Sequence, residues 1–256
     1  MAAGELFDMS GEVALITGGG TGIGFALARA LAINGATVAL AGNEPDSLQA
    51  AVEAIAACGG RAISVALDVR QDEMIVSAFD QVENALGPVG VLVNSAGIAH
   101  RDKATHLSRE TFQNVMSVNV DSAFMVAQEA ARRMIRDGRS GSIINVSSIL
   151  SEVPVRQVAA YGTSKAALSH LTRCLALEWA KHNIRVNEIR PGWFDSALTD
   201  RFLKGPAAKV MASQTPLGRL GDFRDLDGAV LLLASKAGVY MTGSAITVDG
   251  GYSVNH

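Results

Sequence analysis

The sequence predicts an α/β fold in which a doubly wound, mostly parallel sheet of seven strands carries helices on both faces. Short apolar runs alternate with longer segments of helical periodicity along the chain, the pattern of a parallel sheet that is buried on both sides. The first apolar run also breaks into a glycine-rich turn that leads into a helix, as in a βαβ unit. Of the 256 residues, 48% are hydrophobic and 18% charged, so a large core is available.

The expected elements follow one another in regular order. Strands are expected at residues 12–16, 36–41, 61–67, 89–93, 142–146, 184–189 and 245–248. Helices are expected at 25–33, 45–58, 71–86, 108–136, 160–181 and 225–234, with a loop that contains short helices at 192–222. No repeat, low-complexity tract or linker interrupts this order. Residues 1–256 are therefore expected to form one domain.

Composition excludes several classes of function. The net charge of −3 and the pI near 6.0 provide no basic surface for nucleic acid or an anionic membrane. Cys58 and Cys174 form no CxxC pair, which favours reduced thiols in a cytoplasmic protein. The sequence shows no secretory signal pattern and no apolar run long enough to span a membrane. The five histidines lack metal-ligand spacing, so no metal site is predicted.

The glycine-rich turn between the first strand and the first helix indicates a nucleotide site. Its glycines, Gly18, Gly22 and Gly24, would let backbone amides approach a pyrophosphate closely, and the helix N-terminus adds partial positive charge. The spacing Gly-x3-Gly-x-Gly differs from the general Gly-x-Gly-x-x-Gly fingerprint. The turn alone is therefore weak evidence, and the strand before it and the helix after it strengthen it.

Further along the chain, several polar residues lie just past predicted strands. Asn94, Ser148 and the pair Pro191-Gly192 each follow a strand, and the carboxyl ends of parallel strands line one crevice. Turn propensity alone would also explain Asn and Gly at such positions. Tyr161 and Lys165 lie four residues apart on a predicted helix, so they share one face. A nearby ammonium would lower the pKa of the phenol and make it a usable acid or base.

Taken together, these residues resemble the compact, single-domain branch of the short-chain dehydrogenase/reductase family, and the resemblance covers nearly the whole chain. The matching motifs are Thr17-Gly18-x3-Gly22-Ile23-Gly24, Asp68-Val69, Asn94-Ser95-Ala96-Gly97, Asn119, Ser148, Tyr161-x3-Lys165, Asn183-Ile184-Arg185-Val186-Asn187, Arg190-Pro191-Gly192 and Asp249-Gly250-Gly251. Ser95 stands where the family usually has a second Asn, and Ser196 where a Thr usually follows Pro-Gly. The resemblance implies a Rossmann fold and an NAD(P)-dependent oxidoreductase that interconverts a secondary alcohol and a ketone.

The resemblance also implies a role for each matching residue. Tyr161 would transfer the proton, Ser148 would donate a hydrogen bond to the reacting oxygen, and Lys165 would lower the Tyr161 pKa and hold the nicotinamide ribose. Asn119 would hold a water that relays protons from Lys165. Residues implied in cofactor binding are Gly18, Thr21, Gly22, Ile23, Gly24, Asn43, Asp68, Val69, Asn94, Ala96, Gly97, Tyr161, Lys165, Pro191, Gly192, Phe194 and Ser196.

The choice between NAD and NADP depends on the end of the second strand. In the family an acidic residue there favours NAD, and a basic residue one place later, or just before Gly22, favours NADP. Here Gly42, Asn43 and Thr21 occupy these positions, so neither signal is present. Glu44 is close by and would repel a 2′-phosphate, which favours NAD.

The substrate is expected to contact residues 149–158 and 193–214. This second segment mixes apolar and charged side chains, which fits either a lid over the substrate or an amphipathic surface helix. Within the family, the sequence most resembles gluconate 5-dehydrogenase-like and 3-oxoacyl-carrier-protein reductase-like members. The resemblance implies a polyol or sugar acid as the substrate, with a carrier-protein thioester as the alternative. Arg101, Lys103 and the arginines of 132–136 would supply a basic rim for a carrier protein, or form a solvated helix end.

Two further expectations concern assembly and catalysis. The helices at 111–136 and 160–181 carry apolar residues on most sides, which favours burial of one face against a second subunit. This agrees with the homotetramer or homodimer that the family resemblance implies. A protein that binds a nucleotide without catalysis is the alternative from another class. Such a protein is expected to have lost Ser148, Tyr161 or Lys165, and all three are present.

Overall fold

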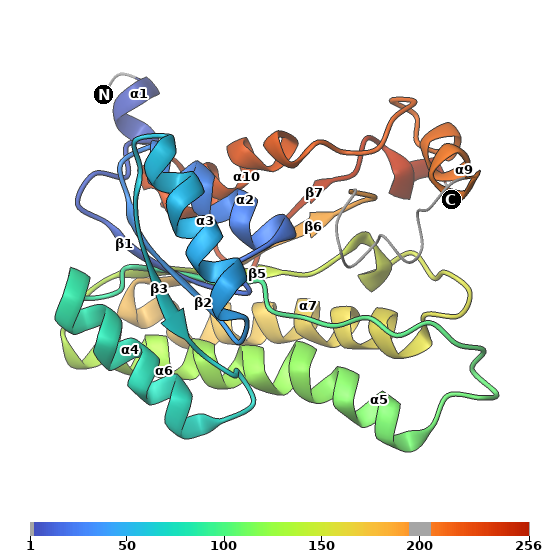
Figure 1. The fold of residues 1–256 in the computed structure, drawn as a ribbon, viewed down its shortest axis with the longest axis horizontal. Helices are drawn as coiled ribbons and strands as arrows, with labels where there is room; N and C mark the ends of the chain where they lie inside the picture. The colour runs from blue at the N-terminus through green and yellow to red at the C-terminus, as the bar shows by residue number, and fades with distance from the viewer. Residues whose placement is uncertain (1–2, 195–205, 256) are drawn as a thin grey trace.

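The fold is built on a sheet of seven strands, which crosses the middle of the molecule in Figure 1. The computed structural model describes residues 3–194 and 206–255. The strand order is β3-β2-β1-β4-β5-β6-β7, and each neighbouring pair is parallel. The strands are β1 (Val13–Thr17), β2 (Thr37–Gly42), β3 (Arg61–Ala66), β4 (Val91–Asn94), β5 (Gly141–Val146), β6 (Ile184–Pro191) and β7 (Ala245–Val248). The predicted doubly wound parallel sheet is confirmed.

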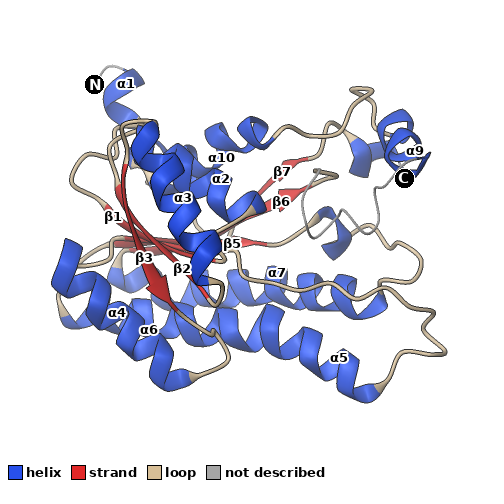
Figure 2. Ribbon diagram, viewed as in Figure 1, coloured by secondary structure: helices blue, strands red, loops and turns tan. Residues whose placement is uncertain are grey.

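Helices cover both faces of this sheet (Figure 2). One layer consists of α2 (Gly22–Ile33), α3 (Pro45–Ala57) and α10 (Asp227–Ala234). The other consists of α4 (Asp72–Leu86), α5 (Arg109–Met116), α6 (Ser122–Arg136) and α7 (Ala159–Trp179). Two short helices, α1 (Ala3–Leu6) and α9 (Pro206–Gln214), complete the described α-helices.

Alternate residues of the central strands fill the two cores. In β1, Ala14 and Ile16 belong to the core beneath α2 and α10, whereas Val13 and Leu15 belong to the core beneath α4 and α6. This alternation follows from the two-residue period of a strand, and it explains why an apolar run without polar alternation still forms a strand. Burial of each such large side chain contributes about 1.5–3 kcal/mol.

The long helix expected at 108–136 is divided. It consists of α5, a π-helical turn η1 (Ser117–Asp121) and α6. Ser108 caps the start of α5, because its hydroxyl accepts a hydrogen bond from the Thr111 amide at 3.0 Å. Asn119 lies within the π-helical turn and is 1% exposed. Extra residues in such turns often reorient a side chain at a functional site.

The sheet order changes direction between β1 and β4, since β2 and β3 lie on one side of β1 and the later strands lie on the other. Parallel sheets of this kind form a crevice at that point, outside the carboxyl ends of the strands. Within residues 3–194 and 206–255, no helix has the length and apolar character needed to cross a membrane. The same residues contain no group of three or more His, Cys, Asp or Glu side chains placed to hold a metal ion.

Candidate active site

A cavity of about 370 Å³ opens at the carboxyl ends of β1, β4, β5 and β6. The glycine turn after β1 forms one wall, the turn after β4 forms another, and α7 presents Tyr161 and Lys165 from below. The sequence-predicted site residues that line it are Gly18, Thr21, Gly22, Ile23, Gly24, Ala96, Gly97, Ser148, Tyr161, Lys165, Pro191, Gly192 and Phe194. The fold therefore gathers most of the predicted site residues around one cavity.

Ser148, Tyr161 and Lys165 form a compact polar group in this cavity. Ser148 follows β5, and its hydroxyl caps the 3₁₀ turn η2 (Ile149–Ser151) by accepting from the Leu150 amide at 3.1 Å. Ser148 and Tyr161 line the same cavity, and the Ser148 hydroxyl is close enough to Tyr161 to lower the pKa of its phenol. Lys165 Nζ lies 5.6 Å from the centroid of the Tyr161 ring and donates to the Val146 carbonyl oxygen at 2.9 Å. The phenol and the ammonium thus face the same space.

Burial sets the protonation of both groups in the free protein. It raises the pKa of Tyr161 to about 12, and the nearby Ser148 hydroxyl only partly opposes that rise. Burial also lowers the pKa of Lys165 to about 8, against the attraction of the Glu188 carboxylate, which raises it. At neutral pH the phenol is therefore protonated and the amine is charged. The lowering of the Tyr161 pKa that the sequence led us to expect is outweighed by desolvation.

Asn119 lies near Lys165, because both side chains border Gly97 in the turn after β4. Its Oδ1 accepts from the Ile98 amide at 2.8 Å, and its Nδ2 donates to the Ile98 carbonyl and to Ser164 Oγ, each at 2.9 Å. A Cβ added to Gly97 would lie 3.2 Å from Asn119 Oδ1 and 3.5 Å from Lys165 Nζ. The amide and the ammonium therefore both border the turn after β4.

The walls of the cavity suit a dinucleotide. A Cβ on Gly24 would collide with the Gly18 carbonyl oxygen, so this close turn requires glycine. The Thr17 hydroxyl, at the end of β1, accepts from the Ser95 and Ala96 amides at 3.1 and 3.2 Å and ties the two turns together. The N-terminus of α2, a helix of 12 residues, begins at Gly22 on the cavity wall. Its unpaired amides and dipole favour an anionic pyrophosphate.

Comparison with known proteins places the chain in a family. The model of a family described as enoyl-(acyl carrier protein) reductase matches residues 18–253. A gluconate 5-dehydrogenase of Gluconobacter oxydans is 36% identical over 256 residues, covering 100% of both chains. The chain belongs to the short-chain dehydrogenase/reductase family. It is an NAD(P)-dependent oxidoreductase that interconverts a secondary alcohol and a ketone.

Other family members resemble the chain over its whole length. A galactitol 2-dehydrogenase (L-tagatose-forming) of Cereibacter sphaeroides is 36% identical and covers 97% of this chain, which in turn covers 98% of that protein. The crystal structure of a gluconate 5-dehydrogenase from Burkholderia cenocepacia, in complex with NADP and tartrate, superimposes with a TM-score of 0.93 at 34% identity. That comparison covers 98% of this chain and 99% of the other.

Some residues that the family resemblance implied lie away from the cavity. Asn94 is buried in the sheet, where its Nδ2 donates to the Ala123 carbonyl and to Asn145 Oδ1. Asp68 binds Arg70 through two hydrogen bonds of 2.9 and 2.6 Å, which lower the pKa of its carboxyl group. Asn43 and Val69 do not line the cavity either. Ser196 lies outside the described residues.

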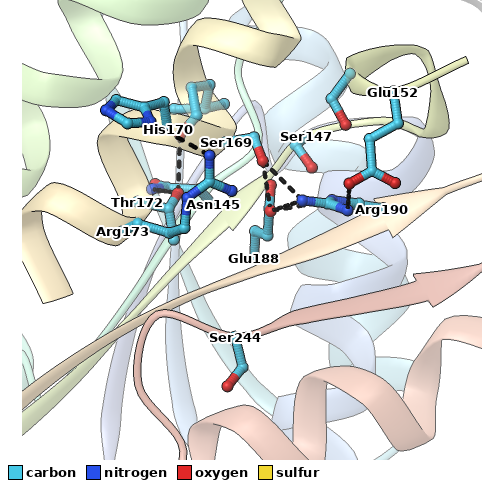
Figure 3. Close-up of polar contacts among 12 residues, drawn as sticks. Asn145, Ser147, Glu152, Ser169, His170, Thr172, Arg173, Glu188, Arg190 and Ser244 are labelled. Carbon is cyan, nitrogen blue, oxygen red and sulfur yellow. Dashed lines mark hydrogen bonds and ion pairs between the residues drawn. The ribbon is translucent and has the colours of Figure 1, made fainter.

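The structure adds residues that the sequence did not point out for this family member. Ala99 and Tyr252 line the cavity, and nothing in their local sequence distinguishes them. Arg101, expected in a basic rim, and Met211, within the segment expected to contact the substrate, line it as well. Below the cavity, Figure 3 shows a buried ionic group on β6 that contains Glu188 and Arg190. The charged residues Arg185, Glu188 and Arg190, in and directly after one predicted strand, are a signal in the sequence that could have revealed it.

Proposed function

We propose that this enzyme oxidises the secondary alcohol of a sugar acid to a ketone, and catalyses the reverse reduction, with Tyr161 as the group that moves the proton. The observation that carries the proposal is that Ser148, Tyr161 and the Lys165 ammonium line one cavity, with Lys165 Nζ 5.6 Å from the centroid of the Tyr161 ring, and that Arg101 and Arg156 line the same cavity. Arg156 is exposed at the cavity and makes no ion pair with a described residue. A guanidinium there suits a carboxylate.

Each of the four polar residues has a distinct part in this reaction. The bound nicotinamide supplies or accepts the hydride. In reduction, the protonated Tyr161 gives its proton to the carbonyl oxygen, while Ser148 donates a hydrogen bond to that oxygen as negative charge develops. The Lys165 ammonium stabilises the phenolate that remains. Asn119 holds a water that relays protons between Lys165 and solvent, so that the proton given up by Tyr161 is replaced.

We propose NAD as the preferred cofactor. Glu44, at the start of α3, carries a carboxylate near the end of β2, where it would repel a 2′-phosphate. Because a gluconate dehydrogenase of similar fold is in complex with NADP, each assay compares both cofactors. We further propose that residues 1–256 form one domain and that the protein assembles as a homotetramer or homodimer.

A second candidate substrate is a 3-oxoacyl thioester. The cavity wall also contains the apolar side chains of Leu150, Val155 and Met211, which would accommodate an acyl chain better than a polyol. The matched family model is described as enoyl-(acyl carrier protein) reductase. A strong preference for NADPH together with turnover of the thioester, but not of sugar acids, would favour this candidate.

The test is a substrate panel with matched variants. Sugar acids, polyols, diketones and 3-oxoacyl thioesters are assayed with both cofactors by the absorbance of the reduced nicotinamide. Tyr161→Phe should lower kcat by at least about 10²-fold and leave cofactor binding intact. Tyr240→Phe is the control, because Tyr240 is fully exposed. Undiminished turnover in Tyr161→Phe would overturn the proposal.

The proposed contact between the substrate carboxylate and Arg156 is tested separately. Arg156→Met should raise KM for sugar acids about tenfold, as expected for one lost charge-assisted hydrogen bond, and leave KM for polyols unchanged. Arg173→Met, at an exposed position on α7, serves as the control. An equal rise of KM for acids and polyols would exclude a carboxylate contact at Arg156.

A further inference from the structure

A carboxylate is buried beneath the active site. Glu188, in the middle of β6, is 2% exposed. Its Oε1 accepts from Ser169 Oγ at 2.7 Å and from Arg190 Nε and Nη2 at 3.0 and 2.6 Å (Figure 3). Its Oε2 has no hydrogen-bond partner among the described residues. A buried ion pair with an unpaired oxygen is often no more stable than apolar side chains of similar size, so stability alone does not explain this group.

The carboxylate lies close to Lys165. Ser169, which binds Glu188, is one helical turn beyond Lys165 on the same face of α7, about 6 Å along the helix. Lys165 Nζ is itself bound to the carbonyl of Val146, which pairs with Ile189, the residue after Glu188. No described carboxylate lies within ion-pair distance of Lys165, and Glu188 is the acidic group whose attraction opposes the effect of burial on the Lys165 pKa.

Near Lys165, two carboxylates and one guanidinium carry a net charge of −1, which balances the charge of the Lys165 ammonium. Arg190 Nη1 is bound to a second carboxylate, Glu152, which is 63% exposed in the segment after η2. Arg190 thus serves two carboxylates. With Lys165, these groups are neutral as a set, and the remaining titratable neighbour, Tyr161, is protonated at neutral pH.

We propose that Glu188 is a positioning residue that acts through Lys165. Its carboxylate, held in place by Ser169 and Arg190, keeps the buried Lys165 amine charged and oriented towards the cofactor and Tyr161. Because this inference rests on the proposed function, it deepens the account of the same active site. It also predicts that Lys165 binds the cofactor in its charged form over a wider pH range than burial alone would permit.

The decisive variant is Glu188→Gln, which keeps the shape and the acceptor oxygen but removes the charge. In ketone reduction, the alkaline limb of the profile of kcat/KM against pH should move to lower pH by about one unit or more, the size expected when one nearby opposite charge is removed. The pH at which NADH or NADPH affinity falls, followed by nucleotide fluorescence, should move by the same amount. Glu178→Gln, exposed on α7, should leave both profiles unchanged.

A second pair of variants separates charge from packing. Glu188→Asp retains the charge and alters the packing, so its alkaline limb should stay near that of the wild type. Glu152→Gln removes the exposed carboxylate without disturbing the core. Since Arg190 is then paired with Glu188 alone, the alkaline limb should move in the same direction as in Glu188→Gln but by less. If Glu188→Gln does not fold, the profile of Glu152→Gln serves as the test.

Three results would overturn the inference. They are superimposable profiles of the wild type and Glu188→Gln, an equal shift in Glu188→Asp and Glu188→Gln, or an unmoved limb in Glu152→Gln when Glu188→Gln fails to fold. Failure of the proposed function is distinguishable, because it would appear as undiminished turnover in Tyr161→Phe. The cofactor-binding profile would then still test the coupling of Glu188 to Lys165.

Discussion

The Thr17 hydroxyl offers a sharp test of how the two turns of the site are held together. Thr17 ends β1 and is 1% exposed, and its Oγ1 accepts hydrogen bonds from the Ser95 and Ala96 amides at 3.1 and 3.2 Å. Thr17→Val preserves the shape of the side chain but leaves both amides without this acceptor. A buried donor left unpaired costs about 1–3 kcal/mol. Because Ala96 borders the cavity, where solvent can reach it, we take the lower end and expect about 2–3 kcal/mol.

Thr17→Val should also weaken the affinity for the nucleotide, since the turn containing Ser95 and Ala96 forms part of the cavity wall. If the same free energy is needed to reorder the turn on binding, the Kd of the nucleotide should rise about 30- to 150-fold. Urea unfolding measures the stability change, and nucleotide fluorescence measures the Kd. Thr17→Ser is the matched control, because it keeps both acceptor contacts and loses one methyl group, at a cost of about 1 kcal/mol. Equal stability and equal affinity of the two variants would refute the reasoning.

Two other predictions concern buried charged side chains, one outside the active site and one within it. The Arg133 side chain is 9% exposed and binds Asp80, Glu83 and Glu129 at 2.7–2.8 Å. Arg133→Met should therefore lower the free energy of unfolding by about 3–5 kcal/mol. Arg136→Met, at a side chain 59% exposed, should change it by less than about 1 kcal/mol. Equal losses in urea unfolding would contradict this. The buried Lys165 has its pKa lowered to about 8 from 10.5, so between these values the unfolded chain binds more protons than the folded one. Stability of the wild type relative to Lys165→Met should therefore rise by up to about 3 kcal/mol from pH 8 to pH 10.5; a difference independent of pH would show that the folded pKa is not lowered.

The parts of the site that depend on local spacing could be predicted from the sequence. The glycine turn requires glycine because of a close backbone approach, and Tyr161 and Lys165 share a helix face at any position where that helix forms. Each strand was also expected within a few residues of its observed bounds, because the central strands are apolar on both faces. These features need no knowledge of distant contacts.

Features that depend on long-range contacts could not be predicted in the same way. Asn94 follows a predicted strand as a ligand-binding residue would, but in the structure it is bound to Asn145 and to the backbone of α6. The π-helical turn at Asn119 reflects hydrogen bonds to Ile98 and Ser164, which are far away in the sequence. Local periodicity continues through that turn, so nothing in the sequence indicates that the helix is divided.

The polar contacts beneath α7 explain why its register on the sheet is well defined. Successive residues of one face, Lys165, Ser169 and Thr172, bind Val146, Glu188 and Asn145. Apolar packing alone tolerates small rotations and shifts of a helix, whereas hydrogen bonds with fixed partners on two strands do not. Tyr161 continues this face by one turn towards the cavity. Because β5 and β6 supply all three partners, the position of the phenol is tied to the sheet itself. The tyrosine that we propose moves the proton is therefore fixed relative to the sheet by its own helix.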